Sequence, residues 1–225
     1  MFSAGRGREL RAFCKSAEVR FKSLELLNLS LTHRSVSNET GERANNERLE
    51  FLGDAVLGAI TAASLYERFP EKSEGELAKI KSVVVSEEIL SGIALELGLD
   101  GALVLGKGEE QTGGRGKKAI LADALEALIG ALYLDSGFKA ASDFTLRRIN
   151  AEIDRVLSNR ASRDYKSLLQ EYCQGLYKTC PVYRLVKRTG PEHERLFWME
   201  VSVNGRVFGP STGRNKKAAE QEAAR

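Results

Sequence analysis

The sequence predicts two domains, an all-α domain over residues 1–157 and a small α+β domain over residues 164–225. Up to about Val156, apolar residues recur at helical spacing, and glycine- or proline-containing breaks separate the helical segments. After Asp164 the pattern becomes a helix, three strand-like runs and a final helix. Residues 158–163 are polar and lack apolar anchors, so we predict a linker there.

The composition is that of an ordinary globular protein, with 42% hydrophobic and 29% charged residues. Acidic residues interrupt the apolar runs and no apolar stretch follows the basic N-terminus, so we expect no membrane span and no signal peptide. Three cysteines without metal-ligand spacing favour reduced thiols and a cytoplasmic location. From Asp164 onward the chain has 11 Lys and Arg against 7 Asp and Glu, which suits a polyanion-binding domain joined to a catalytic body.

The first predicted apolar helix covers residues 24–31 and is followed by Thr32, His33, Arg34 and Ser35. His33 has the chemistry of a catalytic base. Because the chain has only 2 histidines and no nucleophile motif stands near this one, a structural role is favoured.

A long helix is predicted from the stretch Asn45–Leu57 onward, continuing to Leu65. Glu47, Glu50 and Asp54 recur along it at i, i+3 and i+7, which places three carboxylates on one face. Like charges at that spacing repel, and burying them unpaired is costly. The stretch therefore requires a cationic partner, either Arg and Lys side chains or a divalent metal.

The next helices have recognisable starts and stops. Phe69 and Pro70 end the long helix, and Ser73 is a predicted N-cap followed by an acidic first turn over residues 74–76. Ser86 is predicted to cap a further helix that ends at Gly98.

Residues 106–116 are too glycine-rich for a regular element to be predicted, and Lys117 and Lys118 follow them. The segment lacks the spacing of a phosphate-binding Walker loop, which disfavours nucleotide binding. Two interpretations of this segment remain equal. It is either a mobile basic loop beside a functional site or a simple connector between helices.

A second acidic pair lies in the predicted apolar helix over residues 119–134, where Asp123 and Glu126 are spaced i, i+3. With Glu50 and Asp54 they form an oxygen-only ligand set that suits Mg²⁺ or Mn²⁺, and the lack of a His/Cys cluster disfavours zinc. From spacing alone, salt bridges between these carboxylates and Arg or Lys side chains are as well supported as a metal site. The available cations are Arg48, Lys79 and Lys81.

A further helix is predicted from Gly137 to about Leu157, and the elements of the C-terminal domain follow the linker. The predicted helices and strands there are 165–176 (helix, with Leu168, Leu169 and Tyr172 on one side), 181–186, 196–203 and 206–208 (strands) and 215–224 (helix). Asn204 and Gly205 predict a two-residue hairpin turn. This order of elements predicts a three-stranded antiparallel sheet with both helices on one of its faces.

These motifs resemble bacterial ribonuclease III over nearly the whole chain and in the right order. The resemblance rests on NNERLEFLGDAVL at 45–57, LTHRS at 31–35, SEGE at 73–76 and ILADALEALIGALYLDSG at 120–137. The segment from Asp164 resembles a double-stranded-RNA-binding domain, through its DYK, GPEH and KKAAE motifs.

The resemblance implies an all-helical nuclease domain of the RNase III endonuclease fold that acts as a homodimer. It implies metal binding by Glu50, Asp54, Asp123 and Glu126, with Asp54 and Glu126 the catalytic pair. Glu47 and Glu74 match outer acidic positions, and Phe51 matches an aromatic that packs into the partner subunit. The implied cofactor is Mg²⁺, with Mn²⁺ as a substitute.

The implied reaction is hydrolysis of double-stranded RNA to 5′-phosphate and 3′-hydroxyl ends with short 3′ overhangs, in the processing of ribosomal RNA precursors and some mRNAs and tRNAs. We expect in-line attack by metal-activated water, because the scarcity of histidines disfavours a mechanism through the RNA 2′-hydroxyl. A non-cleaving double-stranded-RNA-binding regulator is the alternative.

RNA contacts implied by the resemblance fall in three places of the small domain. Each reads the shape and 2′-hydroxyls of an A-form duplex rather than its sequence. The contacts are Gln170, Glu171 and Gln174 on the first helix, Pro191 and His193 in a loop, and Lys216 and Lys217 at the start of the last helix.

Overall fold

The computed structural model describes residues 2–41, 44–161, 165–191 and 194–225. Its contacts divide the chain into two compact units, Met1–Val156 and Leu157–Arg225, and each is described by itself.

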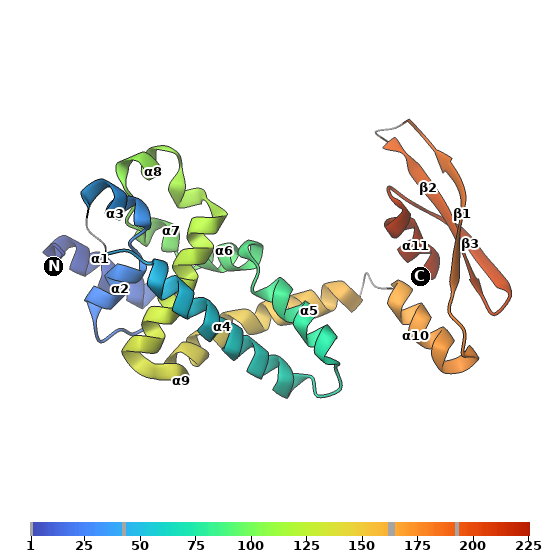
Figure 1. The fold of residues 1–225 in the computed structure, drawn as a ribbon, viewed down its shortest axis with the longest axis horizontal. Coiled ribbons are helices and arrows are strands. Elements are labelled where there is room, and N and C mark those ends of the chain that lie inside the picture. The colour runs from blue at the N-terminus through green and yellow to red at the C-terminus, as the bar shows by residue number, and fades with distance from the viewer. Residues whose placement is uncertain (1, 42–43, 162–164, 192–193) are drawn as a thin grey trace. The chain divides into compact units, whose positions relative to one another are not determined.

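Described residues of the first unit form helices without a regular strand (Figure 1). The only β-type pairing among the described residues of this unit is an isolated bridge between Thr32 and Val104. The helices are α1 (Ala4–Ser16), α2 (Leu24–Ser30), α3 (Arg34–Thr40), α4 (Glu47–Arg68), α5 (Glu74–Val84), α6 (Glu87–Glu96), α7 (Leu99–Ala102), α8 (Lys107–Gln111), the 3-10 helix η1 (Gly114–Gly116) and α9 (Lys118–Ala161).

Helix α4 and the first half of α9 cross in the middle of this unit (Figure 1). Leu57, Ile60 and Leu65 of α4 are buried, as are Leu121 and Leu128 of α9, so these two helices supply much of the core. Helix α4 is long and apolar enough to cross a membrane by length and composition, contrary to the expectation that no run reaches that length. Its buried side chains identify it as a central core helix.

Two local predictions are confirmed by backbone geometry. Ser73 and Glu76 form a capping box at the start of α5, in which the Glu76 carboxylate accepts the Ser73 backbone N–H at 2.9 Å. Gly137 has φ 84° and ψ 175°, which interrupts α9 and begins the predicted further helix.

The predicted irregular segment 106–116 instead contains α8 and η1. Distant residues order it: the Glu39 carboxylate accepts the backbone N–H groups of Lys107 and Gly108 at 2.9 and 3.0 Å. Arg115 donates to the carbonyls of Asp100 and Leu103 at 2.6 and 3.0 Å. Because these partners are remote in sequence, glycine content alone gave the wrong prediction.

The predicted linker 158–163 is helical as far as Ala161, where α9 ends, and residues 162–164 lie outside the described residues. The second unit then has α10 (Tyr165–Tyr177), β1 (Val182–Thr189), β2 (Leu196–Val203), β3 (Arg206–Gly213) and α11 (Lys216–Ala224).

The strands form one antiparallel sheet of order β1-β2-β3, with α10 and α11 on one face (Figure 1). Asn204 and Gly205, at φ 48° and 80°, make the predicted turn, since Val203 pairs with Arg206 across it. Strands β1 and β3 extend beyond Val186 and Phe208, where the prediction ended, because the β2 ladder continues to pair with them.

The side of α10 that faces the core is that of Cys173. Cys173 is buried and Leu169 half-buried, whereas Leu168 and Tyr172 are 52% and 58% exposed. The apolar side predicted from Leu168, Leu169 and Tyr172 is therefore largely exposed. The described cysteines Cys14, Cys173 and Cys180 are free, as expected.

Candidate metal centre

The site depends on a close approach of two helices at glycines. A Cβ on Gly53 of α4 would overlap the Glu126 carbonyl of α9, and a Cβ on Gly130 would lie 2.9 Å from the Gly53 nitrogen. Only residues without side chains permit backbones this near to one another. The crossing therefore brings the acidic faces of α4 and α9 together.

Three of the four predicted metal ligands converge at this crossing. Glu50, Asp123 and Glu126 each offer one carboxylate oxygen, and these oxygens all lie within 4.8 Å of one another. Asp54 is outside that group and exposed, but it is the charged residue that raises the pKa of Glu126 most. Two helices thus supply a half-buried set of oxygen ligands.

Electrostatics in the cluster oppose ionisation. Burial, followed by the charges of Asp54, Asp123 and Glu50, raises the pKa of Glu126 to about 7. Burial is also the main cause that raises the pKa of Glu50 and of Asp123. A bound divalent cation would reverse this repulsion and let the carboxylates ionise together.

Two of the three cations that the salt-bridge alternative invoked form no ion pair with these carboxylates among the described residues. None of the ion pairs among them joins Arg48 or Lys81 to one of the four carboxylates. Arg34 lowers the pKa of Glu50 and of Asp123, although burial outweighs it in both. The donor set, oxygen atoms only, fits Mg²⁺ or Mn²⁺.

A cleft of about 510 Å³ opens beside the cluster. Its lining includes His33, Arg34, Asn46, Glu47, Glu50 and Asp123. Glu47 thus shares this cleft with Glu50, and Arg34 pairs with the Glu47 carboxylate at 3.5 Å. Asn46 and Lys117 also line the cleft, and neither was predicted as a site residue.

His33 has a structural role in the cleft, as favoured from the sequence. Its Nδ1 accepts the Ser35 backbone N–H at 3.3 Å and caps α3, and the Ser35 hydroxyl lies 2.9 Å from the same nitrogen. Burial lowers the pKa of His33. With Nδ1 engaged, the ring is positioned as a helix cap.

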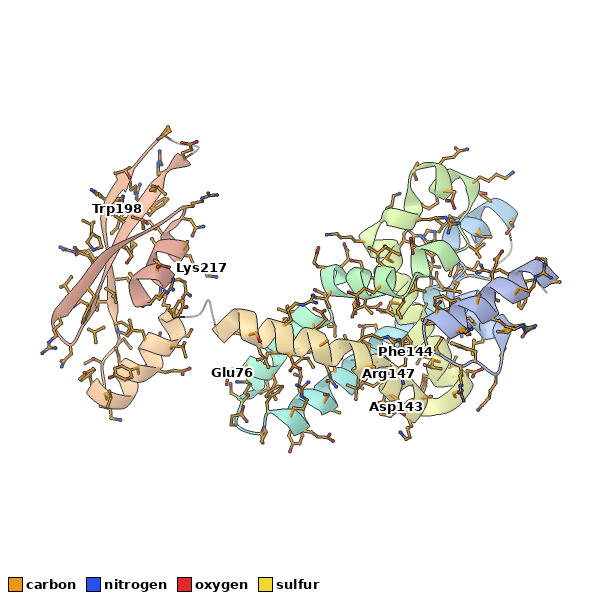
Figure 2. All side chains as sticks on the ribbon, turned by 180° about the vertical axis from the view of Figure 1, so that it is seen from behind. Glu76, Asp143, Phe144, Arg147, Trp198 and Lys217 are labelled. Atoms are coloured by element: carbon orange, nitrogen blue, oxygen red, sulfur yellow. The ribbon has the colours of Figure 1, made fainter. Side chains whose placement is uncertain are left out.

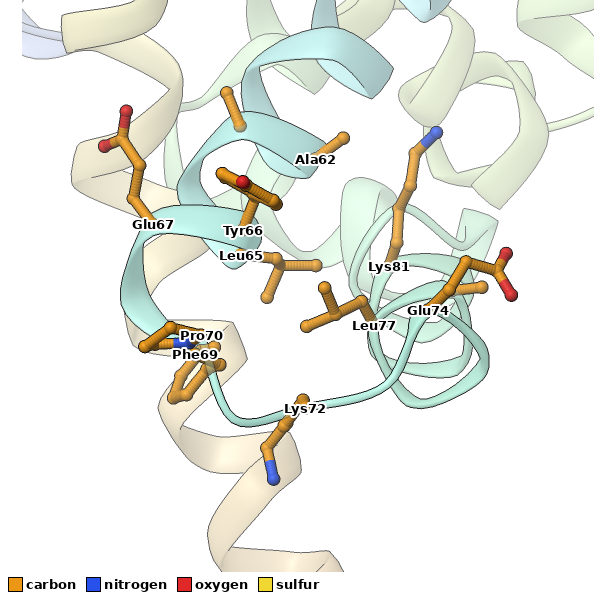
Figure 3. Close-up of a pocket in the computed structure, with 12 residues that line it drawn as sticks. Ala62, Leu65, Tyr66, Glu67, Phe69, Pro70, Lys72, Glu74, Leu77 and Lys81 are labelled. Atoms are coloured by element: carbon orange, nitrogen blue, oxygen red, sulfur yellow. The ribbon is translucent and has the colours of Figure 1, made fainter.

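Glu74 does not line the cleft that holds Glu47 and Glu50. It borders a separate pocket of about 1010 Å³ between α4 and α5. Figure 3 shows Leu65 of α4 and Leu77 of α5 pointing toward one another there, with Glu74 and Lys81 on the α5 side. Phe51, on the outer face of α4, is 81% exposed.

The predicted RNA-contacting residues that the structure describes are on the surface of the second unit. Gln170, Glu171 and Gln174 are exposed on α10, and Pro191 is exposed after β1. Lys216 and Lys217 are exposed at the start of α11, and Figure 2 shows Lys217 there. His193 lies outside the described residues.

Comparisons with known proteins agree with this architecture. A family model described as ribonuclease-III-like matches residues 23–153, and a double-stranded RNA binding motif matches residues 165–225. Ribonuclease 3 of Treponema denticola is 56% identical over 221 residues, covering 98% of this chain and 90% of that protein. Ribonuclease 3 of Treponema pallidum is 50% identical, covering 98% and 88%.

Among solved structures, the nuclease domain of ribonuclease III from Campylobacter jejuni superposes with a TM-score of 0.58 and 40% identity, covering 62% of this chain and 94% of that one. In that relative, structural flexibility is described in a region involved in dimer formation. The chain combines a helix crossing at two glycines, which gathers the carboxylates, with an α-β-β-β-α unit. It also matches ribonuclease 3 of Treponema denticola over 98% of its own length. The chain belongs to the ribonuclease III family.

Proposed function

We propose that this ribonuclease hydrolyses phosphodiesters within double-stranded RNA, leaving 5′-phosphate and 3′-hydroxyl ends with short 3′ overhangs. The cluster of Glu50, Asp123 and Glu126 carries the proposal, because it gathers hard oxygen ligands beside an open cleft. The natural substrates we propose are ribosomal RNA precursors and some mRNAs and tRNAs.

Glu50, Asp54, Asp123 and Glu126 would hold Mg²⁺, or Mn²⁺ as a substitute. When bound, the cation supplies an activated water and neutralises the charge that develops on the leaving oxygen. Asp54 and Glu126 stand on different helices, so losing either removes one side of the cation's support. Glu47, whose side chain is 51% exposed and pairs with Arg34, would be an outer acidic group of the cleft.

The second unit would deliver the duplex to this site. Gln170 and Gln174 are one helical turn apart on α10, so both can reach one minor groove. Glu171, Pro191 and His193 complete the proposed groove contacts. Lys216 and Lys217 would bind phosphates across the intervening major groove, where exposed amines are attracted to the backbone.

Two copies of the chain would act together as a homodimer. An aromatic side chain that is 81% exposed costs free energy in water, and the pocket between α4 and α5 offers Tyr66 and Leu77 as apolar walls. Phe51 and this pocket share helix α4, so a two-fold axis lets each copy insert its own Phe51 into the other.

Docking of this kind would also give Glu74 a role, because Glu74 borders the pocket that would receive Phe51. Because Phe51 follows Glu50 directly, inserting Phe51 of one copy carries Glu50 of that copy toward Glu74 of the other. Glu74 would then be an outer acidic residue of the partner's site.

The test is an assay of the full chain on a labelled RNA hairpin in Mg²⁺ and in EDTA, with the product ends mapped. We expect cleavage in Mg²⁺, none in EDTA, and products that a 5′-phosphate-dependent exonuclease degrades. A chain that binds the hairpin tightly but leaves it intact in Mg²⁺ would be the non-cleaving regulator instead.

A further inference from the structure

His33 uses one edge of its imidazole ring to hold the start of α3. Its Nδ1 accepts the Ser35 backbone N–H at 3.3 Å, and the Ser35 hydroxyl lies 2.9 Å from the same nitrogen. That hydroxyl also accepts the Gly106 backbone N–H at 2.8 Å, which leaves its own proton to point at Nδ1. Two donors are therefore directed at Nδ1, so this nitrogen carries a lone pair and no proton.

This arrangement fixes the tautomer of the ring. A neutral imidazole has one N–H, and with Nδ1 as the acceptor that proton is on Nε2. Burial lowers the pKa of His33, which favours the neutral form. The hydrogen bonds of the ring among the described residues all use Nδ1, and the half-buried side chain lines the cleft of about 510 Å³. His33 thus has an N–H donor left to offer in the cleft.

Asp123 is a carboxylate without a donor in the same cleft. One of its oxygens lies within 4.8 Å of oxygens from Glu50 and Glu126. Among the described residues, no hydrogen bond or ion pair reaches this carboxylate. Of the neighbouring titratable groups, His33 lowers the pKa of Asp123 most, so the two side chains are near each other. Carboxylates that bind metal ions in proteins are normally oriented by a hydrogen bond from a further residue.

Glu109 is a second carboxylate near the ring, and its charge raises the pKa of His33 more than the charge of Asp123 does. However, Glu109 already accepts a hydrogen bond from the Lys117 Nζ at 2.6 Å. Its oxygens also lie outside the group of three that converges at the helix crossing. Asp123 is therefore the carboxylate that both lacks a donor and belongs to the ligand set.

We propose that the Nε2–H of His33 orients the Asp123 carboxylate as a ligand of the divalent cation, through one bridging water. The inference rests on the proposed function, because it takes Mg²⁺ as the occupant of the site. A water is the link because no direct hydrogen bond joins the two side chains among the described residues and both line an open cleft. His33 is then a positioning residue that acts through Asp123.

Two substitutions separate the cap from the donor. His33→Asn places an amide oxygen where Nδ1 stands, so it keeps the N-cap and loses the Nε2–H. His33→Gln reaches the place of Nε2 with an amide donor, but its longer side chain is not a good N-cap. Calorimetric titration of the full chain should show Mg²⁺ binding weakened about 10- to 100-fold in His33→Asn and less in His33→Gln.

The thermal unfolding midpoint in EDTA should show the opposite order, falling more in His33→Gln than in His33→Asn. If His33 were only a helix cap, Mg²⁺ affinity would follow the unfolding midpoint in both variants, and that result would overturn the proposal. Ser23→Asn exchanges the N-cap of α2 outside the cleft. This matched control should bind Mg²⁺ as the wild type does.

Nitrogen-15 NMR of the histidine rings in the wild-type full chain tests the tautomer without any change at position 33. The chain has 2 histidines, and the spectrum of His193→Gln identifies the signals of His33. We expect a protonated Nε2 and a bare Nδ1 near neutral pH, and an Nε2–H signal that moves when Mg²⁺ is added. A proton on Nδ1, or His33 signals that ignore Mg²⁺, would refute the proposal.

Glu109→Gln decides between the two carboxylates. The loss of Mg²⁺ affinity caused by His33→Asn should be the same in this background as in the wild type, because the acceptor is Asp123. A loss that vanishes there would make Glu109 the acceptor and contradict the proposal. If the wild-type chain itself binds no Mg²⁺, the proposed function fails, whereas normal Mg²⁺ binding by a folded His33→Asn chain refutes this inference alone.

Discussion

Gly53 of α4 packs against the backbone carbonyl of Glu126 in α9 so closely that a Cβ has no room. The contact joins the helix that carries Glu50 to the helix that carries Asp123. The lack of a side chain at Gly53 is therefore a condition for gathering the carboxylates.

Gly53→Ala should push α4 and α9 apart. We expect a destabilisation of about 1–3 kcal/mol, typical of overpacking in a core, and weaker binding of Mg²⁺. Chemical denaturation and calorimetric metal titration measure the two effects. Gly92→Ala in α6, where an added Cβ meets nothing within 4 Å, is the control and should not weaken Mg²⁺ binding. A Gly53→Ala chain that binds Mg²⁺ normally would contradict the role of the crossing.

Glu126→Gln should abolish cleavage and leave RNA binding intact, because the proposed RNA contacts of the second unit are unchanged. We expect at least about a 10²-fold loss of single-turnover rate, since even losing an outer partner of a metal ligand costs about 10–100-fold. Glu96→Gln, at the exposed end of α6, should behave as wild type. Comparable turnover by Glu126→Gln in Mg²⁺ would remove Glu126 from the site.

The contribution of Glu126 to the stability of the metal-free chain should fall as pH rises from about 4.5 to about 7. The pKa of Glu126 is raised from 4.5 to about 7 in the fold, so the unfolded chain loses this proton first. The stability that protonated Glu126 contributes is fully present below the pKa of the unfolded chain. It is lost as pH rises through the pKa of the folded chain.

The measurement is the thermal midpoint of the nuclease unit in EDTA across this pH range, relative to Glu126→Gln, which cannot titrate there. We expect the wild type to lose stability relative to the variant as pH rises. Mg²⁺ should restore it near pH 7, because a ligand that binds the folded state stabilises that state. A difference that stays flat with pH would argue against the raised pKa.

Phe51→Ala should weaken the dimer and spare the protomer. The side chain is 81% exposed, so its removal leaves the core of one copy intact. If Phe51 anchors the partner, its loss should raise the dissociation constant by about 30-fold or more, as for an interface hot spot. Sedimentation velocity checks this, with Phe208→Ala on β3 as an exposed aromatic control. An unchanged dimer would place the interface elsewhere.

Replacing Lys216 and Lys217 by Ala should weaken RNA binding uniformly across sequences. Each lost phosphate contact should also reduce the slope of log affinity against log salt by about 0.9. Filter binding at several salt concentrations gives both values. Arg206→Ala, on an exposed residue that begins β3, is the control. An unaltered slope would mean that the two lysines do not meet phosphates.

Features that depend on neighbours in sequence were predictable. The spacing of Asp123 and Glu126, the cap formed by Ser73 and Glu76 and the break at Gly137 all follow from residues within one helical turn. The expectation of a cationic partner for Glu50 likewise came from like charges on one face of a helix.

Only the tertiary structure decided which of these features meet. It brought Glu50 to Asp123 and Glu126, left Glu74 on a different pocket, and ordered residues 106–116 through Glu39 and Arg115. It also left the side-chain nitrogen of Asn46 buried without a hydrogen-bond partner among the described residues. Helical periodicity fixes only the direction in which a side chain leaves its own helix. Side chains of two helices converge only where the two backbones approach closely, and here Gly53 and Gly130 allow that approach.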